Sequence, residues 1–194
     1  RVDRRQRQMC IRDSLASASH MIRSFDGHIP EIAASAYVDE SATVVGDVTI
    51  GDDVSVWPGA VLRGDRGRIV LEEGANVQDN ATVHEGAEIG PYSTVGHNAI
   101  VHAATVGRRC MVGMGAIVLD DSRIGDESLV GANSVVTEGT EIPDSSLAVG
   151  TPAEVIKEVE DSYWHDAADR YIELSTTHEA TGEILDQEQT HPDR

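Results

Sequence analysis

The chain has few aromatic residues, one lysine and two cysteines. Aromatic residues make up 4% of its 194 positions, and Phe25 is the single phenylalanine. Small and aliphatic side chains therefore have to fill the core. Cys10 and Cys110 supply neither a disulfide framework nor a thiolate metal cluster, which fits a reducing compartment. We expect a cytoplasmic protein.

Positive charge is also scarce. The chain has 15 basic and 34 acidic residues, a formal net charge of −19. Such a surface repels duplex DNA and anionic membranes, so neither nucleic acid nor a membrane is an expected partner. No apolar run approaches the roughly 18 residues that a membrane span requires. The chain has many acidic residues and a single lysine, Lys157, and this composition resembles that of halophilic proteins.

The first 20 residues differ from the rest because they contain five arginines. No apolar segment follows these arginines, so the stretch is not a secretory signal. Residues 5–14 resemble translated sequencing-adapter sequence. We interpret residues 1–20 as a non-native extension and expect natural translation to start at Met21. The remaining length is that of one domain.

An internal repeat of six residues runs through most of the chain. Small residues follow most of the repeated aliphatic positions four residues later, as at Ala81, Ala99 and Ala116, and glycine often follows directly. The aliphatic positions are Val38, Val44, Ile50, Val56, Leu62, Leu71, Val77, Val83, Ile89, Val95, Val101, Val106, Val112, Val118, Ile124, Val130, Val136 and Ile142.

A period of six matches neither a helix nor the two-residue alternation of an ordinary β-sandwich. It fits a short strand followed by a tight corner, with one aliphatic side chain per strand in a narrow interior. Three such units per turn form a triangular prism of stacked parallel strands. The sequence therefore predicts an all-β solenoid, a left-handed parallel β-helix of hexapeptide repeats over residues 21–153.

The repeat is irregular in two places and then ends. Three extra residues stand between Leu62 and Leu71, and one residue is missing between Val101 and Val106. Irregular rungs of a repeat array often mark its functional face. After Pro152 the period disappears, and we expect a C-terminal amphipathic α-helix at 154–179 and a loose tail at 180–194.

Three histidines lie beside these irregularities. His84 and His102 each follow an inward aliphatic residue and are 18 residues apart, which is one turn of three hexads. They should stack on successive coils and converge on one metal ion. His97 is out of phase with both and lies near another corner. A neighbour related by a threefold axis could supply it, so we predict a homotrimer with metal sites between subunits.

Longer motifs resemble the gamma-class carbonic anhydrase family, a branch of the hexapeptide-repeat proteins. The resemblance covers nearly all of the chain after Met21. It rests on Trp-Pro-Gly-Ala-Val-Leu-Arg-Gly-Asp at 57–65, Asn-Val-Gln-Asp at 76–79 before His84, Val-Gly-His at 95–97, Val-His at 101–102, Val-Gly-Met-Gly-Ala at 112–116 and Gly-Thr-Pro-Ala at 150–153.

This resemblance implies reversible hydration of CO₂ to bicarbonate by a metal-bound hydroxide at the subunit interface of a trimer. The three matching histidines would bind Zn²⁺, Fe²⁺ or Co²⁺, two from one subunit and one from its neighbour. Gln78 matches a residue that orients hydroxide or substrate, and Asp79 matches a supporting acid beside the metal. Tyr171 matches a tyrosine that approaches the site in some members, although a packing role fits equally well. Arg63 and Asp65 match a salt bridge across the subunit interface.

The chain departs from the best-catalysing members at two positions. Arg66 stands where they have a glutamate, and His84 is followed by Glu85-Gly86 and the next repeat, without their acidic loop. Both missing carboxylates serve proton transfer, so we expect a slow enzyme. Glu85 or Glu88 would be the substitutes.

Two other functions fit the same repeat. A hexapeptide-repeat acyltransferase would use one histidine as general base for acyl transfer from coenzyme A. A non-catalytic, metal-stabilised trimeric assembly module would need no proton relay. Hydrolysis of thioesters at the same metal site is a smaller alternative.

Overall fold

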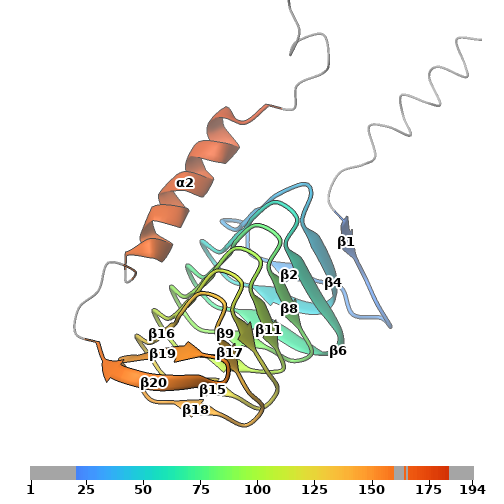
Figure 1. Cartoon of the computed structure of the whole chain (residues 1–194). Helices are drawn as coiled ribbons and strands as arrows, with labels where there is room; N and C mark the ends of the chain where they lie inside the picture. Colours follow the sequence, from blue (N-terminus) through green and yellow to red (C-terminus); the bar gives the residue numbers. More distant parts are fainter. Residues whose placement is uncertain (1–20, 160–163, 165, 184–194) are drawn as a thin grey trace, which may run out of the picture.

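The computed structural model describes residues 21–159, 164 and 166–183. The chain winds from Met21 as a left-handed parallel β-helix, and its short strands form the three faces of a triangular prism with one helix alongside (Figure 1). The predicted all-β solenoid with a C-terminal helix is confirmed. Residues 1–20, interpreted as an extension, lie outside the described residues, as do residues 184–194 of the expected tail.

Each coil contributes one strand to each face. The first face contains β3 (Tyr37–Val38), β5 (Ser55–Val56), β7 (Asn76–Val77), β10 (Thr94–Val95), β13 (Met111–Val112), β16 (Leu129–Val130), β19 (Ser146–Gly150) and β20 (Ala153–Glu158). The second face contains β1 (Met21–Arg23), the first halves of β4 (Thr43–Ile50) and β6 (Val61–Leu71), β8 (Thr82–His84), β11 (Ile100–His102), β14 (Ile117–Val118) and β17 (Val135–Val136). The third face contains β2 (Glu31–Ile32), the second halves of β4 and β6, β9 (Glu88–Ile89), β12 (Thr105–Val106), β15 (Arg123–Ile124) and β18 (Glu141–Ile142).

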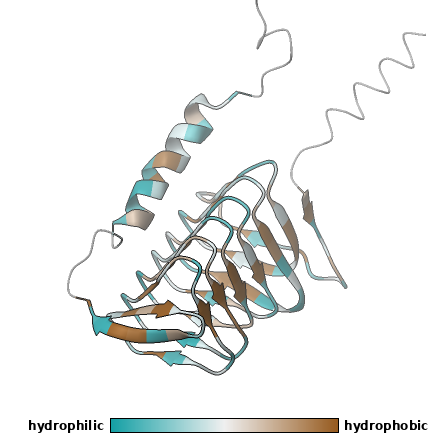
Figure 2. Cartoon of the chain, viewed as in Figure 1, coloured by the Kyte–Doolittle hydropathy of each residue, from teal (hydrophilic) through white to brown (hydrophobic). Residues whose placement is uncertain are grey.

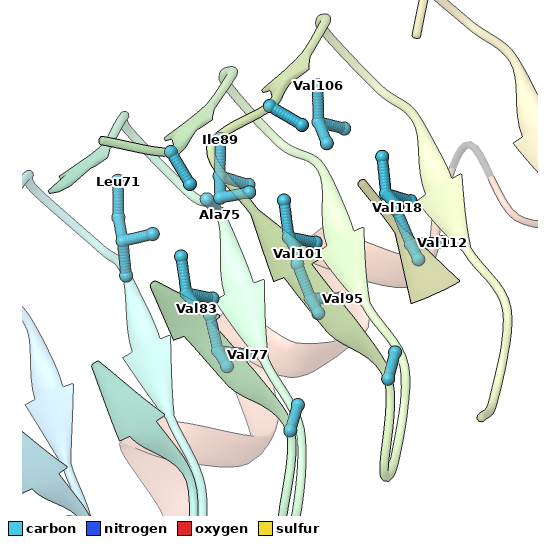
Figure 3. Close-up of a cluster of buried hydrophobic side chains, with 14 of the residues drawn as sticks. Leu71, Ala75, Val77, Val83, Ile89, Val95, Val101, Val106, Val112 and Val118 are labelled. Atoms are coloured by element: carbon cyan, nitrogen blue, oxygen red, sulfur yellow. The ribbon is translucent and has the colours of Figure 1, made fainter. Parts of the chain in front are cut away.

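The interior of the prism is a set of stacked aliphatic columns. Leu71, Ile89 and Val106 form one column, and two valine columns stand opposite it (Figure 3). All of the repeated aliphatic positions from Val44 to Val136 are at most 1% exposed. The alanines at the second inward positions are also buried, because a larger side chain there would overfill the narrow interior. The six-residue pattern therefore encodes the core directly.

Both irregular rungs appear in the strand register. A regular coil has 18 residues, as between Val77 and Val95. The three extra residues place Thr82 opposite Val61, 21 positions earlier, and they extend β6 around the corner between the second and third faces. The missing residue places Val118 opposite Val101, only 17 positions away.

The C-terminal boundaries differ from the predicted ones. Residues 154–158 do not begin the helix, because Ala153–Glu158 is strand β20, which pairs antiparallel with β19. The β-branched pair Val155–Ile156 favours an extended backbone, and the free edge of β19 accepts its hydrogen bonds. The helix, α2 (Ala167–Thr181), extends two residues into the segment expected to be a tail.

Helix α2 covers part of the first face. It contacts β3 and β5, and Trp57 packs between its Tyr171 and the strand residue Tyr37. The outward residues Asn76 and Thr94 of the same face are also buried, and their side chains hydrogen-bond to each other at 2.8 Å. No helix in the described part of the chain has the length and apolarity needed to cross a bilayer.

The outward side chains of the second face form a stripe of four aliphatic residues and one threonine, called the aliphatic stripe below. Figure 2 shows that hydrophobic residues follow the strands, whereas the corners are more polar. On the second face, the residues that point outward are also largely hydrophobic. These outward positions are in register with one another and partly exposed, and Ile100 is 37% exposed. They are Val61, Thr82, Ile100, Ile117 and Val135. The corresponding third-face positions include Glu88, Arg123 and Glu141, so the second face is the more apolar of the two.

Candidate metal centre

His84 and His102 lie side by side where the second face meets the third. Each is the last residue of its strand, and the two are direct register partners of β8 and β11. Their ring centroids are 5.0 Å apart with an interplanar angle of 69°. The side chain of His84 is 10% exposed and that of His102 is 29% exposed, so both can be reached from the surface. The stacking predicted from the 18-residue spacing is present.

Glu85 joins this pair. Possible ligand atoms of His84, Glu85 and His102 all lie within 4.8 Å of one another. One oxygen of Glu85 lies 3.9 Å from His102 Nε2, and the other accepts a hydrogen bond from Arg66 at 3.2 Å. Glu85 reaches this position because its φ of 50° turns the corner directly after His84. Glu88, by contrast, is exposed on β9 of the third face.

Arg63 and Asp65 form an ion pair beside His84. Arg63 Nη1 donates to Asp65 Oδ2 at 2.6 Å, and His84 Nε2 lies 3.1 Å from Asp65 Oδ1. The second guanidinium nitrogen of Arg63 lies 3.4 Å from His84 Nδ1. Partial burial alone would raise the pKa of Asp65, but the hydrogen bonds from Arg63 and His84 hold it below its usual value. The two residues pair within one chain, and the bridge across a subunit interface that the family resemblance implies stays a prediction.

His97 lies at a different corner, where the first face meets the second. Its Nδ1 is 2.8 Å from Asp79 Oδ2, and its backbone N–H donates to Gln78 Oε1 at 3.1 Å. The buried Gln78 side chain also donates to Asn76 Oδ1 at 3.4 Å. Gln78, Asp79 and His97 therefore form one group. The cluster around His84 does not include His97.

Tyr171 projects from helix α2 onto Trp57 of the first face. Its ring lies edge-on to Trp57 at a centroid distance of 5.3 Å. Burial raises the pKa of the Tyr171 hydroxyl, and the negative charge of Asp79 raises it further. The Tyr171 hydroxyl therefore stays protonated near neutral pH. The packing contact with Trp57 is present, and an approach of Tyr171 to the metal site stays a prediction.

Asp120 is a residue of this region that the sequence analysis missed. Its Oδ1 lies 2.6 Å from His102 Nδ1. The available signal was its spacing, since Asp120 follows His102 by 18 residues, as His102 follows His84. A carboxylate offers no motif of its own among 34 acidic residues, so this spacing did not stand out.

Several known proteins are similar to this chain in sequence and in fold. A family model described as bacterial transferase hexapeptide (six repeats) matches residues 103–138. A Geobacillus kaustophilus protein named carbonic anhydrase is 42% identical over 143 residues, which cover 72% of this chain and 79% of the relative. The chain belongs to the gamma-class carbonic anhydrase family of hexapeptide-repeat proteins.

Other members carry different names. The carnitine operon protein CaiE of Escherichia coli K12 is 38% identical over 146 residues, covering 73% of this chain and 74% of the relative. The crystal structure of a hexapeptide transferase family protein from Anaplasma phagocytophilum matches with a TM-score of 0.80 at 36% identity, covering 81% of this chain and 98% of that one. Membership in the gamma-class family therefore establishes the fold and ancestry, and the reaction has to be inferred from the site.

The donor set suits a borderline divalent metal. Two imidazoles and a carboxylate oxygen, close together at a partly exposed corner, are ligands that Zn²⁺ and similar ions accept. His102 Nε2 faces this cluster while Nδ1 faces Asp120. Both ring nitrogens of His84 already have partners, so His84 has to give up one contact to ligate a cation. The residues fit a metal, and the partial exposure of His102 leaves this ligand cluster open to solvent.

Proposed function

We propose that this protein is a trimeric, metal-dependent carbonic anhydrase that interconverts CO₂ and bicarbonate. His84 and His102 of one chain and His97 of a neighbouring chain would hold the ion, which is Zn²⁺ or, alternatively, Fe²⁺ or Co²⁺. The observation that carries the proposal is the in-register pair of imidazoles 5.0 Å apart at a partly exposed corner. A single catalytic base would not require two stacked histidines.

The second face supports the trimer. The His84 and His102 corner lies along one edge of this face, and the His97 corner lies along the opposite edge. Between them runs the partly exposed aliphatic stripe that includes Ile100 and Ile117. Burying such a stripe between copies is favourable, and a threefold axis parallel to the prism brings opposite edges of neighbouring chains together. Each interface would then combine the two half-sites.

The metal would act as a Lewis acid that lowers the pKa of a coordinated water to about 7. The chain's own residues prepare the site for that chemistry. Gln78 is fixed by two hydrogen bonds and retains one N–H donor for a bound oxygen. Asp79 fixes the His97 ring through Nδ1. Arg63 would keep Asp65 ionised after His84 leaves this carboxylate to bind the metal ion.

Proton removal would depend on Glu85, which would lie beside the ion and not ligate it once His97 of the neighbouring chain supplies the third ligand. Arg66, which replaces the glutamate of fast members, pairs with Glu85 at 3.2 Å, while Glu88 lies on the third face. The ion pair with Arg66 occupies one oxygen of Glu85 and restrains the side chain, so Glu85 has less freedom to carry a proton from the site to solvent. This arrangement supports slow turnover.

The test is CO₂ hydration by stopped flow on anaerobically purified protein, in molar KCl because the composition resembles that of halophilic proteins. We expect slow activity that disappears on chelation and returns with added Zn²⁺, Fe²⁺ or Co²⁺. A metal-loaded trimer inactive at every pH would contradict the proposal and favour an assembly module. Turnover of acetyl-coenzyme A that chelators do not affect would favour an acyltransferase, which would fit the word transferase in the name of the Anaplasma relative.

A further inference from the structure

Four side chains form a column along the corner between the second and third faces. Asp65, His84, His102 and Asp120 come from four successive coils. The Asp65–His84 contact is 3.1 Å, the imidazole centroids are 5.0 Å apart, and the His102–Asp120 contact is 2.6 Å. The two imidazoles are thus enclosed between two carboxylates.

The contact with Asp120 assigns the two nitrogens of His102. An ionised carboxylate only accepts hydrogen bonds, so Nδ1 of His102 carries the proton that Asp120 accepts. The neutral ring then has its lone pair on Nε2. That nitrogen lies 3.9 Å from Glu85 Oε2, on the side of the ligand cluster.

The backbone fixes Asp120 in this place. The next coil has one more residue at this corner than the coil of His102. Ala103, with φ of 47°, takes the left-handed position in the coil of His102, and Asp121, with φ of 56°, takes it in the next coil. The Asp121 N–H donates to the Ala103 carbonyl at 2.9 Å, and the Asp120 carbonyl accepts from Gly139 N–H at 2.9 Å. Asp120 therefore precedes its corner residue just as His102 precedes Ala103. The irregular rung thus places a carboxylate directly beneath the imidazole.

We propose that Asp120 is a positioning residue for the metal centre, which holds His102 in the tautomer and orientation that present Nε2 to the ion. The inference rests on the proposed metal site. A ligating histidine is more basic and better oriented when its other N–H donates to a carboxylate, and loss of such a partner typically weakens metal binding about 10–100-fold.

The other half-site repeats this arrangement. His97 Nδ1 lies 2.8 Å from Asp79, so this ring also directs Nε2 away from its carboxylate partner. The two corners are built from different strands and turns. At both corners the carboxylate contacts Nδ1 of the histidine, which leaves Nε2 for a metal ion. Two surface ion pairs without a further role would not be expected to share this choice of nitrogen.

The test compares Asp120→Asn with Asp121→Asn, which removes the same charge from the exposed neighbouring residue. Zn²⁺ affinity is measured by competition with a chromophoric chelator, and unfolding is measured in parallel. We expect about 10–100-fold weaker Zn²⁺ binding for Asp120→Asn, and wild-type affinity for Asp121→Asn. Long-range ¹H–¹⁵N spectra of the metal-free proteins should show the Nδ1–H form of His102 in wild type and its loss in Asp120→Asn.

The outcomes separate the two proposals. Wild-type protein that binds no metal would contradict the proposed function itself. Wild-type protein that binds Zn²⁺, with Asp120→Asn equal to Asp121→Asn in affinity and tautomer, would leave the metal site standing and overturn the role of Asp120. A loss of stability in Asp120→Asn without a change in affinity would also overturn it.

Discussion

Trimers assembled from a mixture of His97→Ala and His84→Ala chains are expected to regain metal binding and CO₂ hydration that neither variant has alone. In a homotrimer of either variant, every interface lacks one metal ligand. We expect activity to fall by more than about 100-fold, because losing a ligand costs more than losing a residue that only orients a ligand. In a mixed trimer, one interface combines the intact His97 of one chain with the intact His84 and His102 of the other.

The size of the recovery follows from the symmetry. With random exchange of equal amounts of chains, roughly a quarter of all interfaces receive both intact halves, so roughly a quarter of wild-type activity should return. A mixture of His84→Ala with His102→Ala is the matched control. Both residues belong to the same half-site, so no combination of these chains restores an interface.

Subunit exchange has to be shown independently, by mass spectrometry of chains carrying tags of different mass. Exchange without recovery in the His97 and His84 mixture would contradict the shared site. Equal recovery in the control mixture would contradict the assignment of His84 and His102 to the same half-site.

Ile89→Ala is expected to cost about 2–5 kcal/mol of unfolding free energy, the range for truncating a fully buried isoleucine. Ile89 is 0% exposed and stands in the middle of the column between Leu71 and Val106 (Figure 3). Each coil inserts a single large side chain per face, so neighbouring coils have little freedom to fill the cavity. Denaturant unfolding followed by circular dichroism measures the change.

Glu88→Ala is the matched control for this substitution. Glu88 is the adjacent residue of β9, but it points outward and is exposed. We expect a change within about 0.5 kcal/mol, as for surface substitutions in general. Similar costs for both variants would contradict the alternation of inward and outward residues on the third face.

The core of this fold was predictable because one rule repeats. Every sixth position faces inward, so the sequence alone indicated the columns of aliphatic side chains and the register of His84 with His102. The terminal elements were harder, since no repeat extends past Pro152. Strand β20 forms because β19 offers a free edge, and that edge is not visible in the local sequence.

The site was predictable only in part for a similar reason. The histidines stand out as rare residues at a coil spacing, whereas Asp120 and Glu85 are two among many acids. Their roles depend on corner geometry, namely on which residue takes the left-handed conformation. The pairing of Arg63 with Asp65 within one chain likewise follows from the extended strand β6.

Native mass spectrometry of wild-type protein, loaded with Zn²⁺ and freed of excess metal, tests the shared metal centre most directly. We expect a trimer that carries one ion per chain, and metal-free monomers once the trimer dissociates. Monomers that retain one ion each would contradict a site completed by His97 of a neighbouring chain.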